Sequence, residues 1–337
     1  MTVPLLAADG GNSKTDVALL AADGTVLAFV RGPTVSHQRV ELAEAGTRLL
    51  GLVRDAARDA GLAVDAPIAA LGVLCLAGMD LPSDARELRA VHGRSGIAAS
   101  IVLENDTVAG LRAGSPVPWG VGVDVGAGMN GVGIAPDGRR AAFAGLGPIS
   151  GDRGGGAALG MDALGAAVRA RDGRGPRTVL EQLVPAHFGL RRPIDVTVGI
   201  YRGRIPESRV RELAPVAIRA AAAGDAVAAT LLDDLADECA AFAIASIRWL
   251  RVTRRPVPVV LSGGVSRGAG ALLADRVAAR VHAIAPLAVV SVLDAPPVLG
   301  AALLGLDRLA PGDERAAARA REGLAKDPRI ARDPGRT

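Results

Sequence analysis

The feature that most constrains the fold is a pattern of strands and helices that occurs twice along the chain. In each copy, two short apolar runs flank a glycine turn, a third strand follows, and helices and strands then alternate. The glycine turns lie at 10–11 in the first copy and at 126–128 in the second. A repeat of this length is more specific than either turn alone. It predicts two α/β domains, related by internal duplication, whose glycine turns line one cleft between them.

The repeat also predicts where the domains begin and end. We expect an N-terminal domain over 1–115, joined by a C-terminal helix at about 298–310, and a C-terminal domain over 116–297. A long, mostly helical insert at 154–250 interrupts the second copy. The stretch 311–337 is rich in Arg, Asp, Ala and Gly, so we predict a flexible tail there, frayed or partly helical.

Composition disfavours several functional classes. Half of the 337 residues are hydrophobic, the net charge is only +4, and no basic patch is interleaved with aromatic residues, so nucleic-acid binding is not indicated. The N-terminus lacks a charged region ahead of its short apolar run, and no apolar stretch reaches membrane-spanning length. Cys75 and Cys239 lie far apart in apolar runs, which is typical of buried thiols. We therefore expect a cytoplasmic protein without nucleic-acid or membrane partners.

The first glycine turn carries groups that suit phosphate. Gly10 and Gly11 let the backbone approach a ligand and point N–H groups at it, and Ser13 adds a hydroxyl. Lys14 is one of only two lysines in the chain, and its point charge fits a phosphate contact. Asp9, just before the turn, is a candidate to hold Mg²⁺ directly or through water. Taken alone, however, the turn is better explained as an ordinary solvated hairpin.

Asp106 follows a predicted strand at 101–103, where the clefts of α/β proteins open. A carboxylate at this place can accept the proton of a hydroxyl that attacks a γ-phosphoryl group. Residues 105–107 also read as a helix N-cap, and on these residues alone the cap is the better explanation. The surrounding motifs change that balance in favour of a catalytic base.

Five motifs, in order over residues 3 to about 309, resemble the N-acetylglucosamine kinase branch of the BadF/BadG/BcrA/BcrD group. They are DGGNSKTD at 9–16, END at 104–106, GAGMN at 126–130, GPISGDRGGGAALG at 147–160 and LSGGV at 261–265. That group belongs to the actin/hexokinase/Hsp70 ATPase superfamily. The resemblance implies two ribonuclease H-like domains with a cleft between them. It also implies ATP-dependent phosphorylation of a sugar hydroxyl, the 6-OH of N-acetylglucosamine or a related amino sugar.

The resemblance further implies roles for the motif residues in binding ATP and the metal. Asp106 would be the catalytic base, and Asp9 would position Mg²⁺. Asp225, which opens a predicted helix at 226–250, would meet the nucleotide, although it reads equally well as a helix N-cap. The groups that contact ATP would be Gly10, Gly11, Asn12, Ser13, Lys14, Gly126, Ala127, Asp225, Gly263 and Gly264.

The sugar site implied by the resemblance includes several departures from the family pattern. A carboxylate such as Asp152 suits a polyol because it accepts from two hydroxyls. Ala127 and Met129 replace two hydroxyl residues, and Arg153 replaces a glutamate, so the sugar itself is not specified. The residues in contact with sugar would be Ser36, His37, Asp106, Gly128, Asn130 and Asp152.

Two other functional classes remain open at this point. Some members of the group are ATPases that drive a redox partner through a [4Fe–4S] cluster, but the positions of Cys75 and Cys239 disfavour cluster ligation. A non-catalytic sugar sensor would be expected to lack Asp106. A transcriptional regulator would need a DNA-binding segment ahead of the first strand at Val3, and we expect none. A homodimer is implied by resemblance only.

Overall fold

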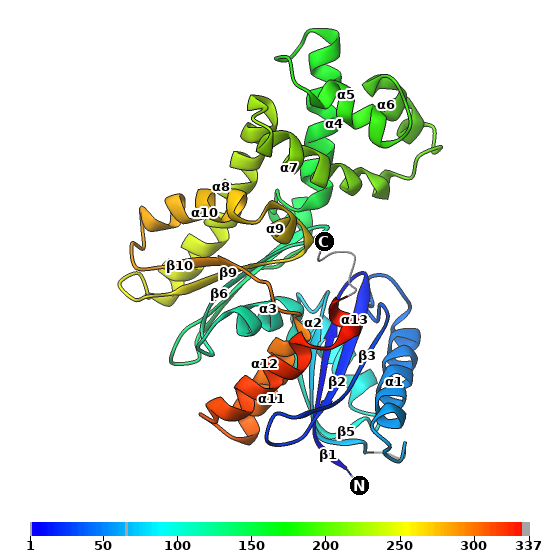
Figure 1. Cartoon of the computed structure of the whole chain (residues 1–337), viewed down its shortest axis with the longest axis vertical. Coiled ribbons are helices and arrows are strands. Elements are labelled where there is room, and N and C mark those ends of the chain that lie inside the picture. The colour runs from blue at the N-terminus through cyan, green and yellow to red at the C-terminus, as the bar shows by residue number, and fades with distance from the viewer. Residues whose placement is uncertain (1, 65–66, 332–337) are drawn as a thin grey trace. The chain divides into compact units, whose positions relative to one another are not determined.

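The structure is a computed structural model, and it describes residues 2–64 and 67–331. The chain forms two compact units (Figure 1). Unit 1 comprises Met1–Gly120 and Leu293–Thr337, and unit 2 comprises Val121–Val292. The C-terminal segment therefore returns to the unit in which the chain begins.

Unit 1 is built on a five-stranded mixed sheet in the order β3-β2-β1-β4-β5. The first three strands form an antiparallel meander, and β4 and β5 run parallel to β1. Central strands β1 and β4 are almost continuously apolar, because helices cover both faces of the sheet. The strands are β1 Val3–Gly10, β2 Lys14–Leu20, β3 Val26–Pro33, β4 Ala69–Leu76 and β5 Ala98–Asn105.

The helices of unit 1 pack closely on this sheet. On α1, residues such as Leu49 and Val53 recur at helical spacing and are fully buried in the core. On α11, a Cβ at Gly300 would lie 1.8 Å from the carbonyl oxygen of Ala109 in α3, so the absence of a side chain allows these helices to touch. The helices are α1 Leu42–Asp59, α2 Pro82–His92, α3 Asp106–Gly114 and α11 Val298–Leu309.

Over the residues that the structure describes, the segment after 311 is helical, which the sequence allowed, and packed on unit 1, which the predicted flexible tail did not include. It contains α12 Glu314–Ala325 and α13 Pro328–Ala331. Ala316, Ala320 and Leu324 on α12 are buried, and Ala316 lies against the turn at Gly24. The segment therefore packs on the β2–β3 meander of unit 1.

Unit 2 contains a second five-stranded sheet in the order β10-β9-β6-β7-β8. Read from the opposite edge, this is the strand order of unit 1, so the predicted duplication of an α/β plan is confirmed. Strand β9 is parallel to both β6 and β10. The strands are β6 Gly120–Val125, β7 Met129–Ile134, β8 Arg140–Ala142, β9 Pro258–Ser262 and β10 Val289–Val292.

The insert in unit 2 is mostly helical, as its composition predicts. Its longest helix, α8, packs on β7, where Gly131 leaves room for the ring of Phe242. The helices of unit 2 are α4 Gly156–Asp172, α5 Leu180–His187, α6 Pro193–Tyr201, α7 Ala214–Ala222, α8 Ala226–Leu250, α9 Gly264–Ala269 and α10 Ala271–His282, with 3₁₀ turns η1 Gly147–Ser150 and η2 Glu207–Leu213.

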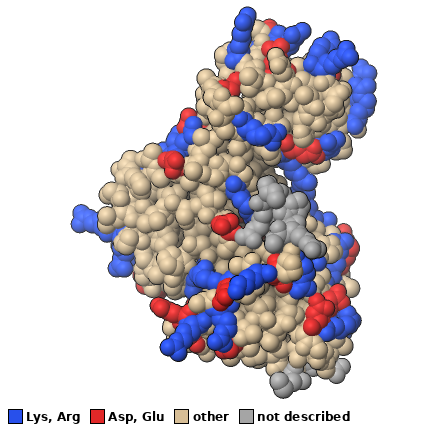
Figure 2. All heavy atoms as spheres, viewed as in Figure 1, with Lys and Arg blue, Asp and Glu red and all other residues tan. Residues whose placement is uncertain are grey.

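Within the described ranges, no single helix is long and apolar enough to cross a membrane. The neighbouring segments Glu207–Ala222 and Ala226–Leu250 are together long and apolar enough to do so, but the chain bends by 115° between them. On the face drawn in Figure 2, basic side chains are scattered among acidic ones. Several arginines of the described chain form local ion pairs, as Arg174 does with Asp172 and Arg192 with Asp195.

Candidate active site

Acidic residues gather at the carboxyl ends of β1, β4 and β5 in unit 1. The register pairs Asp9 with Cys75 and Cys75 with Glu104, so these residues form a row across the sheet. Asp106 follows β5 as the first residue of α3. Burial raises the pKa of the Cys75 thiol, and the charges of Asp9, Glu104 and Asp106 raise it further. Three carboxylates therefore converge on this edge, where parallel strands place ligand sites.

The glycine turn between β1 and β2 is held by short-range contacts. The amide of Gly11 donates to the carbonyl of Lys14 at 3.0 Å, and the Thr34 hydroxyl donates to the carbonyl of Gly11 at 2.7 Å. A Cβ at Gly10 would lie within 2.9 Å of two neighbouring side chains, so the position has no room for one. Residues 12–13, at the tip, are exposed. The turn is thus fixed at its base and open at its tip.

The loop after β3 lies against this turn and brings two predicted sugar residues to it. Ser36 is buried, and its hydroxyl donates to Oδ1 of Asn12 at 2.8 Å. His37 is half-buried, and its Nδ1 has no hydrogen-bond partner among the residues described. At Gly78, where φ is +81°, a Cβ would lie 2.9 Å from the His37 ring. The loop after β4 therefore approaches the same place from the other side.

The helix that begins at Asp106 is capped by its neighbour. Oδ1 of Asn105 accepts a hydrogen bond from the amide of Thr107 at 2.9 Å. Its Nδ2 donates to Oδ1 of Asp80 at 3.0 Å and to the carbonyl of Met79 at 3.2 Å. The N-cap considered for residues 105–107 is therefore Asn105, and the half-buried Asp106 is the first residue inside the helix.

In unit 2, the second glycine turn is joined to the beginning of α4. The amide of Ala157 donates to the carbonyl of Ala127 at 3.0 Å. Gly155 has φ +90°, and a Cβ there would lie 2.5 Å from the carbonyl of Gly128, so only glycine fits. The turn and the helix N-terminus consequently form one backbone surface of the kind that binds anions.

The end of β9 lies beside this turn. The Ser262 hydroxyl donates to Oδ1 of Asp124 at 2.8 Å. Burial raises the pKa of Asp124, although this hydrogen bond and the charge of Arg267 act to lower it. A Cβ at Gly263, where φ is +91°, would lie 2.4 Å from the carbonyl oxygen of Val125. Gly263 and the following Gly264 thus pass directly beside the second glycine turn.

Asp152 organises the loop that leads into α4. Its Oδ2 accepts from the amide of Gly147 at 3.0 Å and from the Ser150 hydroxyl at 2.6 Å. Asp152 is buried, with an exposed fraction of 8%. Asn130 lies close to the start of this loop, because a Cβ at Gly145 would be 2.6 Å from its Nδ2. The structure thus brings Asn130 towards the segment that carries Asp152.

Asp225 is the N-cap of α8, and both of its carboxylate oxygens are engaged. Oδ1 accepts from the amide of Ala228 at 2.9 Å and from the Thr178 hydroxyl at 2.8 Å, and Oδ2 accepts from the amide of Val179 at 2.8 Å. Burial acts to raise the pKa of Asp225, but these hydrogen bonds lower it overall. Of the two roles considered for Asp225, the contacts support the cap, and a nucleotide would have to compete with them.

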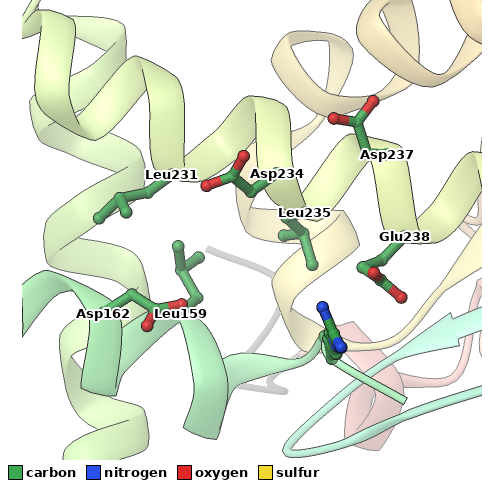
Figure 3. Close-up of a pocket in the computed structure, with 9 residues that line it drawn as sticks. Leu159, Asp162, Leu231, Asp234, Leu235, Asp237 and Glu238 are labelled. Atoms are coloured by element: carbon green, nitrogen blue, oxygen red, sulfur yellow. The ribbon is translucent and has the colours of Figure 1, made fainter. Parts of the chain in front are cut away.

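A cavity of about 330 Å³ lies in unit 2 between α4 and α8 (Figure 3). Arg153, which stands where the family pattern has a glutamate, lines this cavity beside carboxylates of α8. Burial and the charge of Asp234 raise the pKa of Asp162 on α4. The lining residues are Arg153, Gly154, Leu159, Asp162, Leu231, Asp234, Leu235, Asp237 and Glu238.

Both cysteines are buried and unpaired, as the sequence predicts. Cys75 lies in β4 of unit 1, and Cys239 lies in α8 of unit 2, where burial raises its pKa to about 12. In the part of the chain that the structure describes, no three His, Cys, Asp or Glu residues are grouped to hold a metal ion by themselves.

Sequence reasoning did not single out Asp80 and Gln38. Nε2 of Gln38 donates to Oδ2 of Asp80 at 3.3 Å, and Asp80 also receives the hydrogen bond from Asn105. A usable signal existed, because Asp80 follows a predicted buried strand whose neighbour ends at Asn105. The polar residues after adjacent parallel strands meet at one edge of the sheet.

Two α/β units with the same strand order, each with a glycine turn after its first strand, define a two-domain actin-like ATPase. The sequence pattern of the BadF/BadG/BcrA/BcrD ATPase family matches residues 8–305, and the chain belongs to this family. The family inferred from the five motifs is thereby confirmed.

Its curated relatives include kinases of amino sugars. The chain is 28% identical over 260 residues to the N-acetylmuramic acid/N-acetylglucosamine kinase of Clostridium acetobutylicum, covering 76% of this chain and 83% of the relative. It is 26% identical over 312 residues to the N-acetyl-D-glucosamine kinase of Dictyostelium discoideum, covering 89% and 96% respectively.

Solved structures agree with this assignment. A provisionally assigned N-acetylglucosamine kinase from Chromobacterium violaceum is 26% identical, with a TM-score of 0.68 and coverage of 90% of this chain and 99% of that chain. A ROK family glucokinase from Streptomyces griseus, solved with glucose and AMPPNP, shares the fold at 16% identity and a TM-score of 0.53, with 91% and 98% coverage.

Proposed function

We propose that the protein is an ATP-dependent kinase that phosphorylates N-acetylglucosamine or a related amino sugar at the primary 6-hydroxyl. The observation that carries the proposal is the position of Asp106, at the start of α3 on the edge where Asp9 and the first glycine turn lie. The names of the two curated relatives support the class of sugar.

In the proposed reaction, Asp106 accepts the proton of the sugar hydroxyl. The hydroxyl oxygen forms a bond to the γ-phosphorus, the bond between that phosphorus and the bridging oxygen breaks, and ADP leaves. Asp106 is in the first turn of a nine-residue helix, where the helix dipole favours a negative charge. The ionised carboxylate is the form that acts as a base.

The first glycine turn would bind the phosphates through the backbone of Gly10 and Gly11, the polar tip at 12–13 and the charge of Lys14. The donor set also fits Mg²⁺, because this ion is usually held by one or two carboxylates together with phosphate and water. Asp9 would supply that carboxylate, since it is buried at the same edge as Asp106. Bound there, Mg²⁺ would neutralise negative charge on the phosphates.

The remaining contacts would be divided between sugar and nucleotide. Ser36 and His37 in unit 1, with Gly128, Asn130 and Asp152 in unit 2, would bind the sugar. The Asp152 carboxylate suits this role, because a carboxylate can accept hydrogen bonds from two hydroxyls. The backbone at 126–127 and at 263–264 would contact the nucleotide. The homodimer and the cytoplasmic location remain predictions.

The proposal is tested by measuring ADP release with ATP, Mg²⁺ and a panel containing N-acetylglucosamine, N-acetylmuramic acid, glucosamine and glucose. Product analysis by NMR should place the phosphate on O6. Asp106→Asn, which keeps the shape of the side chain, should lower kcat by at least about 10²-fold while sugar affinity by calorimetry stays within about threefold.

A matched control is Asp55→Asn, which removes a charge from an exposed pair with Arg58 on α1. It should leave kcat unchanged. Undiminished turnover by Asp106→Asn would remove the proposed base, and failure to phosphorylate any amino sugar would remove the proposed substrate class.

A further inference from the structure

Asp80 belongs to a hydrogen-bond network of side chains from four separate segments of unit 1. Its two carboxylate oxygens accept from Nδ2 of Asn105 at 3.0 Å and from Nε2 of Gln38 at 3.3 Å. Oε1 of Gln38 accepts in turn from Nδ2 of Asn12 at 3.5 Å. Oδ1 of Asn12 accepts from the Ser36 hydroxyl at 2.8 Å. We call these five residues the Asp80 network.

The direction of each hydrogen bond in the network follows from the carboxylate. An ionised carboxylate only accepts, so Asp80 requires the NH₂ groups of Asn105 and Gln38 to face it. The oxygen of Asn105 then faces the amide of Thr107 and caps α3, whose first residue is Asp106. The oxygen of Gln38 faces Asn12 in the glycine turn. The carboxylate therefore fixes the orientation of the Gln38 amide, and it supports the orientation of the Asn105 amide together with the carbonyl of Met79 and the amide of Thr107.

The loop that carries Asp80 is held close to its partners by the backbone. Gly78 has φ +81°, and a Cβ there would lie 2.8 Å from the side chain of Gln38. Oδ2 of Asp84 accepts from the amides of Asp80 and Leu81 at 3.1 and 2.7 Å. Asp80 is half-buried in this arrangement. These contacts restrict the position of Asp80, unlike that of an exposed surface carboxylate.

We propose that Asp80, in its ionised form, is a positioning residue for the kinase reaction. Through Asn105 it holds the start of α3 and so the Asp106 carboxylate, and through Gln38 it holds Asn12 in the phosphate-binding turn. The inference rests on the proposed function, because it assigns Asp80 to the same reaction without giving it contact with the substrates.

The charge state of Asp80 changes in the mildly acidic range. The groups that face it are Asp84 from α2, His37 from the loop after β3, and the amides of Asn105 and Gln38. Burial, and next the charge of Asp84, raise the pKa of Asp80 to about 6, although the two amides and His37 act to lower it. A protonated Asp80 would place an O–H donor among amide donors. Turnover should therefore decline on the acid side with a midpoint near pH 6.

The decisive variant is Asp80→Asn, alone and combined with Gln38→Glu. Asparagine has the shape of aspartate, but its NH₂ group would face the NH₂ group of Gln38 or Asn105, so kcat should fall at least about tenfold and the acid limb of the pH profile should move. In the double variant the NH₂ of residue 80 faces a carboxylate at 38, and the net charge is that of the wild type. The double variant should recover kcat to within about threefold of the wild type.

An activity-independent readout separates this inference from the proposed function. In ¹⁵N-labelled wild-type protein, the side-chain amide signals of Asn105 and Gln38 should titrate together with a midpoint near pH 6. Asp55→Asn, which removes an exposed charge from the same unit, should leave both the kinetics and this titration unchanged.

Two results would overturn the positioning role. One is a folded Asp80→Asn protein with the kcat and pH profile of the wild type. The other is the absence of a shared amide titration, whatever the activity. A wild-type protein that phosphorylates no amino sugar would instead refute the proposed function, and the amide titration would still decide whether Asp80 orients the two side chains.

Discussion

A buried histidine at the end of α2 should make the stability of unit 1 depend on pH. His92 is 0% exposed, and neither ring nitrogen has a hydrogen-bond partner among the residues described. Burial lowers the pKa of His92 from 6.5 to about 4. Between those values the unfolded chain binds more protons than the folded chain, so the free energy of unfolding falls as the pH falls through this window.

The size of this effect follows from the two pKa values. The difference between the pKa values of the folded and unfolded states, about 4 and 6.5, corresponds to about 3 kcal/mol in the free energy of unfolding, because one pKa unit is about 1.4 kcal/mol. This full difference is reached when His92 has titrated in both states. On going from pH 7.5 to pH 5, about 2 kcal/mol of that stability is lost. For a unit of this size, the His92 contribution corresponds to a change of roughly 4–8 °C in the difference between the Tm of the wild type and that of a variant without this histidine.

The test compares His92→Leu with the wild type by thermal unfolding between pH 5 and 7.5. Trp119 lies in unit 1 and Trp249 in unit 2, and they are the only tryptophans, so a Trp249→Phe background lets Trp119 fluorescence report on unit 1. Because leucine does not titrate, the variant should gain Tm relative to the wild type as the pH falls. The control is His187→Leu, which removes a histidine that pairs with Glu212 in unit 2. Its Tm should depend on pH as the Tm of the wild type does. Parallel Tm curves for the wild type and His92→Leu would refute the reasoning.

Two further substitutions test a backbone contact of the candidate site and a buried ion pair of unit 1. Gly155→Ala should weaken ATP binding at least about tenfold in a binding titration, because the residue has φ +90° and no room for a Cβ. The control Gly165→Ala, where a Cβ would meet open space on α4, should leave ATP binding unchanged. Arg31→Met should lower the free energy of unfolding by about 3–5 kcal/mol in a denaturant titration, because it leaves the buried Asp16 carboxylate without its ion pair. The matched exposed-pair variant, Arg58→Met, should cost no more than about 1 kcal/mol, and equal costs for the two arginine variants would contradict this explanation.

The sheets were predictable because their signal is local and repeated. The run at 69–77 is apolar throughout, and in the structure β4 is covered on both faces. The glycine turns at 10–11 and 126–128 each follow such a run, and both mark the first strand of a sheet with the same strand order. The predictions of fold class and family therefore depended on features that a chain displays without knowledge of its long-range contacts.

The packing of the C-terminal helix α12 on the sheet was not predicted, because its packing face consists mostly of alanine. Ala316, Ala320 and Leu324 recur every four residues, but arginine and acidic residues dominate the segment, so composition indicated a tail. The close contact between α12 and the β2–β3 meander requires a small side chain such as alanine. Gly24 and Gly323 let α12 approach the β2–β3 meander so closely that a Cβ at Gly24 would lie 2.0 Å from the carbonyl oxygen of Ala316.

The ends of adjacent strands could have placed Asp80 near Asn105, but the hydrogen bonds of the Asp80 network could not be predicted from spacing, because its members come from four segments that only the folded sheet brings together. Asn12, Gln38 and Asn105 are separated by tens of residues, and no periodicity links them. Motif resemblance found Asp106 but not the residue that orients its neighbour. A positioning residue of this kind is identified by the direction of its hydrogen bonds, which a sequence does not display.

Asp80 and His92 act in opposite directions on the stability of unit 1. Because the pKa of Asp80 is raised to about 6, the folded chain binds a proton more tightly than the unfolded chain does, and the free energy of unfolding falls as the pH rises through about 4 to 6. Over the same range His92 makes the free energy of unfolding rise with pH. At neutral pH the ionised Asp80 is therefore a destabilising group. If it oriented nothing, an amide at position 80 would suit the stability of the fold better, so its ionised form is explained by the two amides that need an acceptor.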